Sequence, residues 1–126
     1  MNDKPLKLPK LLLAEIITHA LERDPEECCG ILLGRGNTVT QLRRIRNIHD
    51  SGVNRFKMDP FDVIEAERDA RGAGEKFVAI YHSHTYSEGH VGIIIWALDG
   101  PSSRLGIGPQ ERSLYPIVST AASITS

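Results

Sequence analysis

The stretch E-C-C-G-I-L-L-G at residues 27–34 decides how this chain is expected to fold. Its apolar run is short and continuous, begins after a charged residue and ends at a glycine, which is typical of a strand buried on both faces. The stretch K-F-V-A-I-Y at residues 76–81 has the same character and predicts a second buried strand. This strand leads directly into His82-Ser83-His84. Functional sites are commonly built at the ends of such strands, so the tripeptide is the first candidate for chemistry.

Two helices and a further strand are predicted around these segments. Residues 9–23 carry apolar side chains at the i, i+3 and i+4 spacing of an amphipathic helix, which an Asp-Pro pair then ends. Residues 38–45 alternate loosely and predict a strand that forms a hairpin with the first one. A second helix is predicted from Pro60 to Gly72, with Asp59 as its N-cap.

Length and charge exclude several classes of protein. The 126 residues suit one domain, and a net charge of −1 provides no global field for nucleic acid or an anionic membrane. The basic residues at 43–46 and 55–57 alternate along the chain without an aromatic platform, which is typical of a solvated face. The longest uncharged apolar run, residues 91–98, is too short to span a bilayer. We therefore expect a cytoplasmic protein that binds neither nucleic acid nor membrane.

Cys28 and Cys29 are the two cysteines of the chain. Adjacent cysteines close a disulfide only with strain, so they do not form a disulfide framework. We expect one to be a small buried hydrophobe and the other to face a neighbouring helix, with a metal or redox role as the alternative.

The composition changes from about residue 89 onward. Only four of the 31 charged residues lie beyond that point. This tail contains the apolar run at 91–98, a Gly/Pro/Ser-rich stretch at 100–109 and a strand-like segment at 114–119. Because the tail is too short to bury a core of its own, residues 1–126 are interpreted as a single domain with an atypical tail.

His82 and His84 are candidate metal ligands. Side chains at i and i+2 of an extended chain project to the same side, so both imidazoles can reach one metal ion. Neutral imidazole is a suitable ligand for Zn²⁺. Amide hydrolysis at such a site also needs a base that is not itself a ligand. Glu27, at the entry to the other buried strand, is the candidate base, and a carboxylate that caps the preceding turn is its alternative interpretation.

With these motifs in this order, the chain resembles the JAMM metalloproteases, which are also called the MPN+ or Mov34/JAB-domain family. In size it is most similar to the bacterial single-domain branch of this family. The resemblance rests on E-x-C-G at residues 27–30 and Y-H-S-H-T at residues 81–85, and it runs from about Leu11 to Glu88. It implies an α+β fold in which a mixed, curved β-sheet is flanked by helices, similar to that of cytidine deaminases.

The resemblance also implies roles for individual residues. Glu27 would be the general acid/base, and His82 and His84 would be two ligands of a Zn²⁺ cofactor, whereas Ser83 would have no chemical role. The implied substrates are peptide or isopeptide bonds at the C-terminus of a small ubiquitin-like or sulfur-carrier protein with a Gly-Gly tail. Zinc would polarise the scissile carbonyl and acidify a water, and Glu27 would carry the proton of that water to the leaving amine.

The chain departs from the family pattern after the histidines. The family motif continues to P-S-x-x-D, where Ser binds the oxyanion and Asp is the third zinc ligand. The usual spacing places Gly92 at the Ser position and Ile95 at the Asp position. Asp99 also suits a simple turn before Gly-Pro. The nearby substitutes for the third ligand are Asp99, His90 and Glu88.

Three explanations follow from this departure. In the first explanation, the chain is a working zinc metallopeptidase with a relocated third ligand, Asp99 or His90. Alternatively, it is a catalytically inactive MPN-type scaffold that binds the extended tail of a ubiquitin-like protein by strand addition. The third explanation is a lesion, such as a compensated frameshift, in the tail. The expected function is the metallopeptidase, with the inactive scaffold as the alternative.

Overall fold

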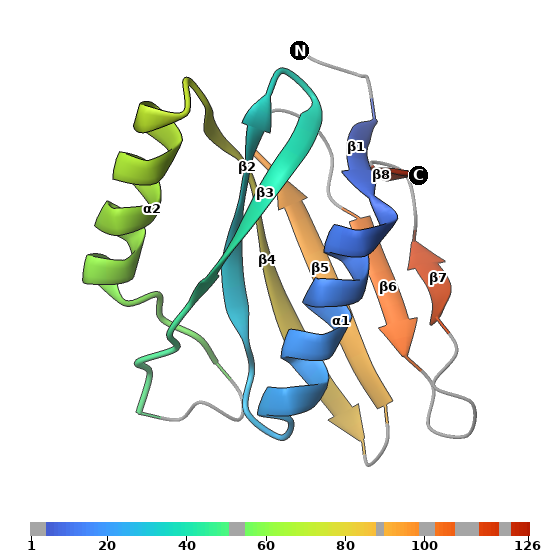
Figure 1. The fold of residues 1–126 in the computed structure, drawn as a ribbon. Coiled ribbons are helices and arrows are strands. Elements are labelled where there is room, and N and C mark those ends of the chain that lie inside the picture. The colour runs from blue at the N-terminus through green and yellow to red at the C-terminus, as the bar shows by residue number, and fades with distance from the viewer. Residues whose placement is uncertain (1–4, 51–54, 88–89, 99–102, 108–113, 119–121) are drawn as a thin grey trace.

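A computed structural model of the chain describes residues 5–50, 55–87, 90–98, 103–107, 114–118 and 122–126. These residues form two helices and a mixed sheet with the strand order β7-β6-β5-β4-β2-β3-β1-β8 (Figure 1). Neither helix is long and apolar enough to cross a membrane. The elements in chain order are β1 (Leu6–Pro9), α1 (Lys10–Arg23), β2 (Cys29–Arg35), β3 (Thr38–Ile45), α2 (Pro60–Gly72), β4 (Lys76–Ser87), β5 (His90–Ala97), β6 (Ser103–Ile107), β7 (Leu114–Val118) and β8 (Ala122–Thr125).

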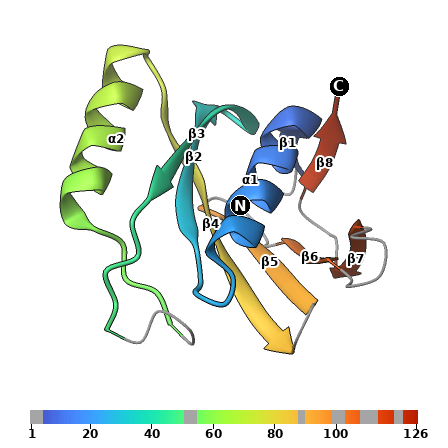
Figure 2. The same ribbon diagram turned by 60° about the horizontal axis from the view of Figure 1, so that its bottom comes forward.

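The centre of the sheet is β2, which pairs antiparallel with β3 on one side and β4 on the other. Its residues from Cys29 to Gly34 are all buried, as the apolar run predicted. The strand β1 pairs in parallel with both β3 and β8, which makes the sheet mixed. The predicted α+β class, with a mixed, curved sheet flanked by helices, is confirmed (Figure 2).

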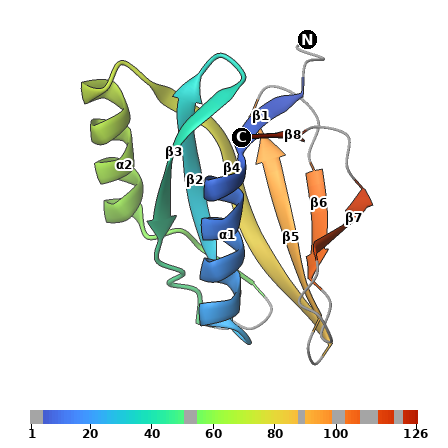
Figure 3. The same cartoon turned by 45° about the vertical axis from the view of Figure 1, so that its right-hand side comes forward.

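The two helices cover opposite faces of the sheet (Figures 2 and 3). Alternate residues of a strand point to opposite faces, so each strand contributes to two separate apolar clusters. The cluster under α1 includes Leu13, Ile16, Leu32, Tyr81, Ile93 and Ile95. The cluster under α2 includes Cys29, Ile31, Leu33, Ala66 and Ala70.

Cys28 and Cys29 follow this alternation. Cys28 packs in the cluster under α1 and Cys29 in the cluster under α2, with 2% and 0% of their surfaces exposed. Burial raises the pKa of both thiols, that of Cys29 to about 12. Both cysteines are therefore neutral thiols that pack as small hydrophobes.

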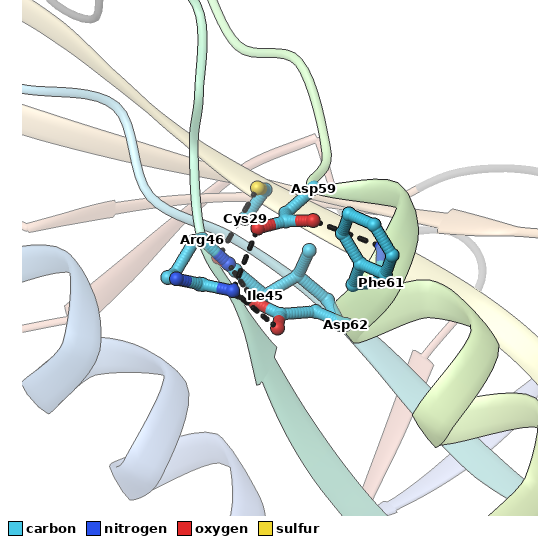
Figure 4. Close-up of polar contacts among 6 residues, drawn as sticks. All are labelled: Cys29, Ile45, Arg46, Asp59, Phe61 and Asp62. Atoms are coloured by element: carbon cyan, nitrogen blue, oxygen red, sulfur yellow. Dashed lines mark hydrogen bonds and ion pairs between the residues drawn. The ribbon is translucent and has the colours of Figure 1, made fainter.

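The start of α2 is fixed to the end of β3. Asp59 caps the helix as predicted, because its Oδ1 accepts a hydrogen bond from the Phe61 backbone N–H at 2.9 Å. Arg46 lies between two acidic residues of this turn, with its Nη2 2.8 Å from Asp59 Oδ2 and its Nε 3.1 Å from Asp62 Oδ2 (Figure 4). These contacts hold the beginning of α2 beside the segment that follows β3.

The chain beyond Tyr81 differs from the prediction. The His-Ser-His tripeptide lies within β4, which continues to Ser87, and does not follow the strand. The expected loop toward P-S-x-x-D is replaced by β5, which pairs antiparallel with β4. β-Branched residues favour strands, and here the side chains of Ile93 and Ile95 are buried under α1.

The tail was only partly predicted. The strand-like segment at 114–119 forms β7, whereas the Gly/Pro/Ser-rich stretch contains β6, which the sequence did not predict. The outer strands β1 and β8 were also not predicted; they pair with each other from Leu6↔Ala122 to Pro9↔Thr125.

Candidate active site

The register between β2 and β4 brings the two candidate motifs together. Cys29 pairs with His82, and the backbone N–H of Ser83 donates to the carbonyl of Cys28 at 3.0 Å. Continuing this antiparallel register by one residue places Glu27 opposite His84. Residues that face each other across an antiparallel pair share a face of the sheet, so Glu27, His82 and His84 all project to the side that α2 covers.

Glu27, His82 and His84 form a cluster that can hold a metal ion. The Nδ1 atom of His84 lies 3.3 Å from Glu27 Oε2, and the Nδ1 atom of His82 lies 3.9 Å from Glu27 Oε1. One donor atom from each of the three residues lies within 4.8 Å of the other two. The two imidazole rings meet edge to face, with their centroids 4.7 Å apart. The prediction that residues i and i+2 bring both imidazoles to one point is confirmed.

Burial changes the protonation of these groups. Only 3% of the surface of Glu27 is exposed, and desolvation raises the pKa of its carboxyl, with the neighbouring His84 opposing this effect. Desolvation, assisted by the positive charge that His84 can carry, lowers the pKa of His82 to about 4. His82 is therefore neutral at physiological pH, which is the form that binds metals.

The donor set fits a metal ion. Among the described residues, the Nδ1 atom of His82 is buried without a hydrogen-bond partner. A buried imidazole nitrogen without a partner is costly, and coordination of a metal would satisfy it. Two imidazoles and a nearby carboxylate are the donor types that Zn²⁺ accepts.

Ser83 holds the two motifs in register. Its Oγ accepts a hydrogen bond from the buried backbone N–H of Cys28 at 2.8 Å, next to the backbone bond between the same two residues. Only 1% of the surface of Ser83 is exposed. Its side chain therefore fixes the position of Glu27 relative to the histidines on either side of it.

A cavity of about 320 Å³ opens at the cluster. Phe56 stacks on His82, with ring centroids 4.5 Å apart and an angle of 25° between the planes. No sequence pattern indicated that the segment after β3 would line this cavity. The lining residues are Glu27, His49, Arg55, Phe56, His82 and His84.

Asn47 holds this segment against Glu27, a role that the sequence did not reveal. Its Nδ2 donates to the carbonyls of Glu27 at 2.9 Å and Arg55 at 3.0 Å. Its Oδ1 accepts from the backbone N–H groups of His49 at 3.1 Å and Lys57 at 2.9 Å. One amide side chain therefore joins both ends of the segment to the residue that enters β2. An asparagine in a polar stretch signals a turn, and its partner 20 residues away can be found only from the structure.

The positions expected for the rest of the family motif lie in β5. Gly92 pairs with His84 and provides no side chain, whereas Ile95 pairs with Tyr81 and is buried under α1, on the opposite face from the histidines. Ile95 cannot contact the cluster. Asp99 and Glu88 lie outside the described residues, and of His90 only the backbone, at the start of β5, is described.

Comparison with known proteins identifies similar chains. Residues 9–89 match the protein family described as prokaryotic homologs of the JAB domain. The chain is 33% identical over 79 residues to a probable TtuB-protein conjugate cleaving protease of Thermus thermophilus, and 41% identical over 58 residues to a desampylase of Pyrococcus furiosus. It is 29% identical over 80 residues to a CysO-cysteine peptidase of Mycobacterium tuberculosis.

These matches cover 63%, 46% and 63% of this chain, and 53%, 41% and 55% of the respective relatives. The chain thus spans about half the length of the curated relatives it matches. Its fold is similar to the solution structure of protein DSY2949 from Desulfitobacterium hafniense, with a TM-score of 0.63 and 22% identity over 94% of this chain and 92% of the other.

Proposed function

The chain belongs to the family of prokaryotic homologs of the JAB domain, as its motifs predicted, and from this premise we propose that it is a zinc-dependent metallopeptidase. Its proposed substrate is a peptide or isopeptide bond at the C-terminus of a small ubiquitin-like or sulfur-carrier protein. The observation that carries this proposal is the cluster of Glu27, His82 and His84 beside a cavity of about 320 Å³. The names of the relatives, which include a conjugate-cleaving protease and a CysO-cysteine peptidase, support the substrate class.

His82 and His84 are the residues that would hold the zinc ion. The unpartnered Nδ1 atom of His82 and the placement of both rings on one side of β4 support this assignment. When bound, zinc supplies Lewis acidity toward the scissile carbonyl and toward the attacking water. Asp99 remains the candidate for a third protein ligand.

Glu27 would act as the general acid/base. Its carboxylate oxygens lie 3.3 and 3.9 Å from the ligand histidines, so the carboxylate borders the place where the attacking water must lie. Glu27 would accept a proton from that water and later donate it to the nitrogen of the leaving amine. The hydrogen bond from Asn47 to the Glu27 carbonyl and the bond between Ser83 and Cys28 hold the carboxylate in place for both transfers.

Zinc content and hydrolysis test this proposal together. We expect the purified chain to bind one zinc ion, and replacement of both His82 and His84 by Ala to remove it, as measured by elemental analysis and competition with a chelator. Glu27→Gln should abolish hydrolysis of a Gly-Gly-tailed carrier fusion while zinc remains bound. Glu26→Gln, an exposed neighbour, is the matched control and should leave both unchanged. Turnover by Glu27→Gln would exclude the proposed base.

One observation favours a second function. The family's Asp position is the buried core residue Ile95, and its Ser position is Gly92. A chain with two histidines as its only ligands would hold zinc weakly and would act as a scaffold that binds the carrier protein without cleaving it. Because β4 is hydrogen-bonded on both sides, a strand added by the carrier would have to pair elsewhere. Carrier binding without zinc or turnover would identify the scaffold, and weaker zinc binding by Asp99→Asn would identify the enzyme with a relocated ligand.

A further inference from the structure

Arg55 lines the candidate catalytic cavity. Among the described residues, no ion pair joins its guanidinium to a carboxylate, and the side chain is exposed. Five other arginines instead form ion pairs or hydrogen bonds within the fold. Arg43, Arg44, Arg46 and Arg71 pair with carboxylates, and Arg35 donates to backbone carbonyls.

The backbone of Arg55 is fixed relative to the catalytic cluster. Its carbonyl accepts from the same Asn47 Nδ2 that donates to the carbonyl of Glu27, at 3.0 and 2.9 Å. The next residue, Phe56, stacks on His82. The carbonyl of Arg55 and the residue that follows it are thus tied to site residues, and these contacts hold the backbone of Arg55 beside the cavity that it lines.

The size and charge of the cavity limit what it can hold. Ligand pockets range over about 300–1,000 Å³, so a cavity of about 320 Å³ suits one amino acid and not a folded protein. Arg55 lines this cavity, and a guanidinium favours a carboxylate, which accepts two parallel hydrogen bonds from it. Glu27, the acidic residue of the lining, is assigned to the proposed proton transfer, which leaves Arg55 available for substrate.

We propose that Arg55 binds the free α-carboxylate of the amino acid released by the reaction, and that the preferred substrate is therefore a carrier protein extended by one amino acid through a peptide bond. In such a substrate a single carbon separates the scissile nitrogen from the carboxylate. An isopeptide-linked lysine instead attaches a four-carbon chain to that nitrogen and has no free carboxylate nearby. This inference rests on the proposed function, since it assigns the leaving group of the same site.

A binding experiment tests the inference independently of turnover. Two carrier proteins are compared that end in Gly-Gly-Ala with a free carboxylate or with a carboxamide, and they differ in nothing else. Calorimetry measures the affinity of each tail for three variants. These are the single variant Glu27→Gln, the double variant with Arg55→Gln, and a control double variant with Lys57→Gln. We expect the carboxylate tail to bind about tenfold tighter, equivalent to about 1.4 kcal/mol, and Arg55→Gln alone to abolish the difference. Equal affinities for the two tails, no binding of either, or an unchanged ratio in Arg55→Gln would overturn it.

Hydrolysis is then compared between the wild type and Arg55→Gln, both with Glu27 intact. This comparison distinguishes binding of the leaving amino acid by Arg55 from an action of Arg55 on the reacting carbonyl. Loss of kcat/KM for the carboxylate tail alone in Arg55→Gln supports recognition of the leaving amino acid. An equal loss for both tails would mean that Arg55 acts on the reacting carbonyl, and equally fast cleavage of an isopeptide conjugate would exclude the proposed preference. If the tails differ in affinity as expected but nothing is cleaved, the inference stands and the proposed function fails.

Discussion

An aspartate introduced into β5 should strengthen zinc binding at one position and destabilise the fold at the adjacent position. Ile94 pairs with His82 and lies on the face of the Glu27, His82 and His84 cluster, whereas Ile95 pairs with Tyr81 and is buried under α1 with 1% of its surface exposed. Paired residues in an antiparallel sheet have Cβ atoms about 4.5–5.5 Å apart, within reach of a shared metal ion. We expect Ile94→Asp to supply a third zinc ligand and Ile95→Asp to disrupt the core.

The magnitudes follow from burial. Truncating a buried isoleucine to alanine costs about 2–5 kcal/mol, and an unsatisfied polar group adds about 1–3 kcal/mol, so Ile95→Asp should lose at least about 3 kcal/mol. This loss is a large share of the free energy of unfolding of a typical domain, about 5–15 kcal/mol. Ile94 is half-buried and lies on the face of β5 opposite Ile93 and Ile95, so Ile94→Asp should cost about 1 kcal/mol, the range of strand propensities. Its zinc Kd should fall about tenfold.

Urea unfolding and chelator competition measure both effects. If Ile95→Asp does not fold, the pair Ile95→Ala and Ile94→Ala repeats the comparison, with expected losses of about 2–5 and under about 1 kcal/mol. Similar stabilities for the two alanine variants would refute the register that places these residues on opposite faces. Unchanged zinc affinity in a folded Ile94→Asp would refute the position of the cluster beside β5.

Further predictions concern the packing around β4. A Cβ at Gly30 would approach the buried ring of Tyr81 well inside 3.0 Å, so Gly30→Ala should destabilise by about 1–3 kcal/mol in urea unfolding, whereas Gly72→Ala, with nothing within 4 Å, should be neutral or stabilising. Ser83→Ala leaves a buried backbone N–H without its acceptor and should cost about 1–3 kcal/mol together with weaker zinc binding. Burial lowers the pKa of His19 to about 4, below its ordinary 6.5, so the unfolded chain binds a proton that the folded chain excludes and stability falls as the pH drops through this range. Between pH 7 and pH 5 the wild type should therefore lose about 2 kcal/mol more than His19→Gln, and equal losses would contradict burial of a neutral histidine.

Helix caps, turns and residue spacing predicted the elements whose structure depends on residues close together in the sequence. The cap at Asp59 and the proline at the first turn of α2 act within four residues, and the observed helix begins at Pro60 as expected. The hairpin of β2 and β3 follows from two short strands and a tight turn. The i, i+2 spacing placed His82 and His84 on one side of β4 because that periodicity is a property of any extended chain.

Long-range contacts account for what was missed. The contacts of Asn47 with Glu27 and Arg55 depend on the path of the chain between them, which no short pattern encodes. The continuation of β4 and the formation of β5 depend on pairing between the two strands, and an apolar run such as residues 91–98 is compatible with a strand or a buried helix until its partner is known. The outer strand β1 pairs in parallel with β8, more than a hundred residues later, and has no sequence signal of its own.

Backbone register therefore positions the proposed site residues Glu27, His82 and His84, whereas among the described residues it places no third candidate ligand beside them. Glu27 faces His84 because β2 and β4 are paired, and the bond between Ser83 and Cys28 depends on the same pairing. These contacts join β2 to β4 and use no side chain of the tail. An aspartate placed at Ile95 to match the family spacing would enter the core under α1, so the family spacing does not transfer to this strand. Zinc affinity, more than folding, is consequently the property that distinguishes an active enzyme from a binding scaffold here.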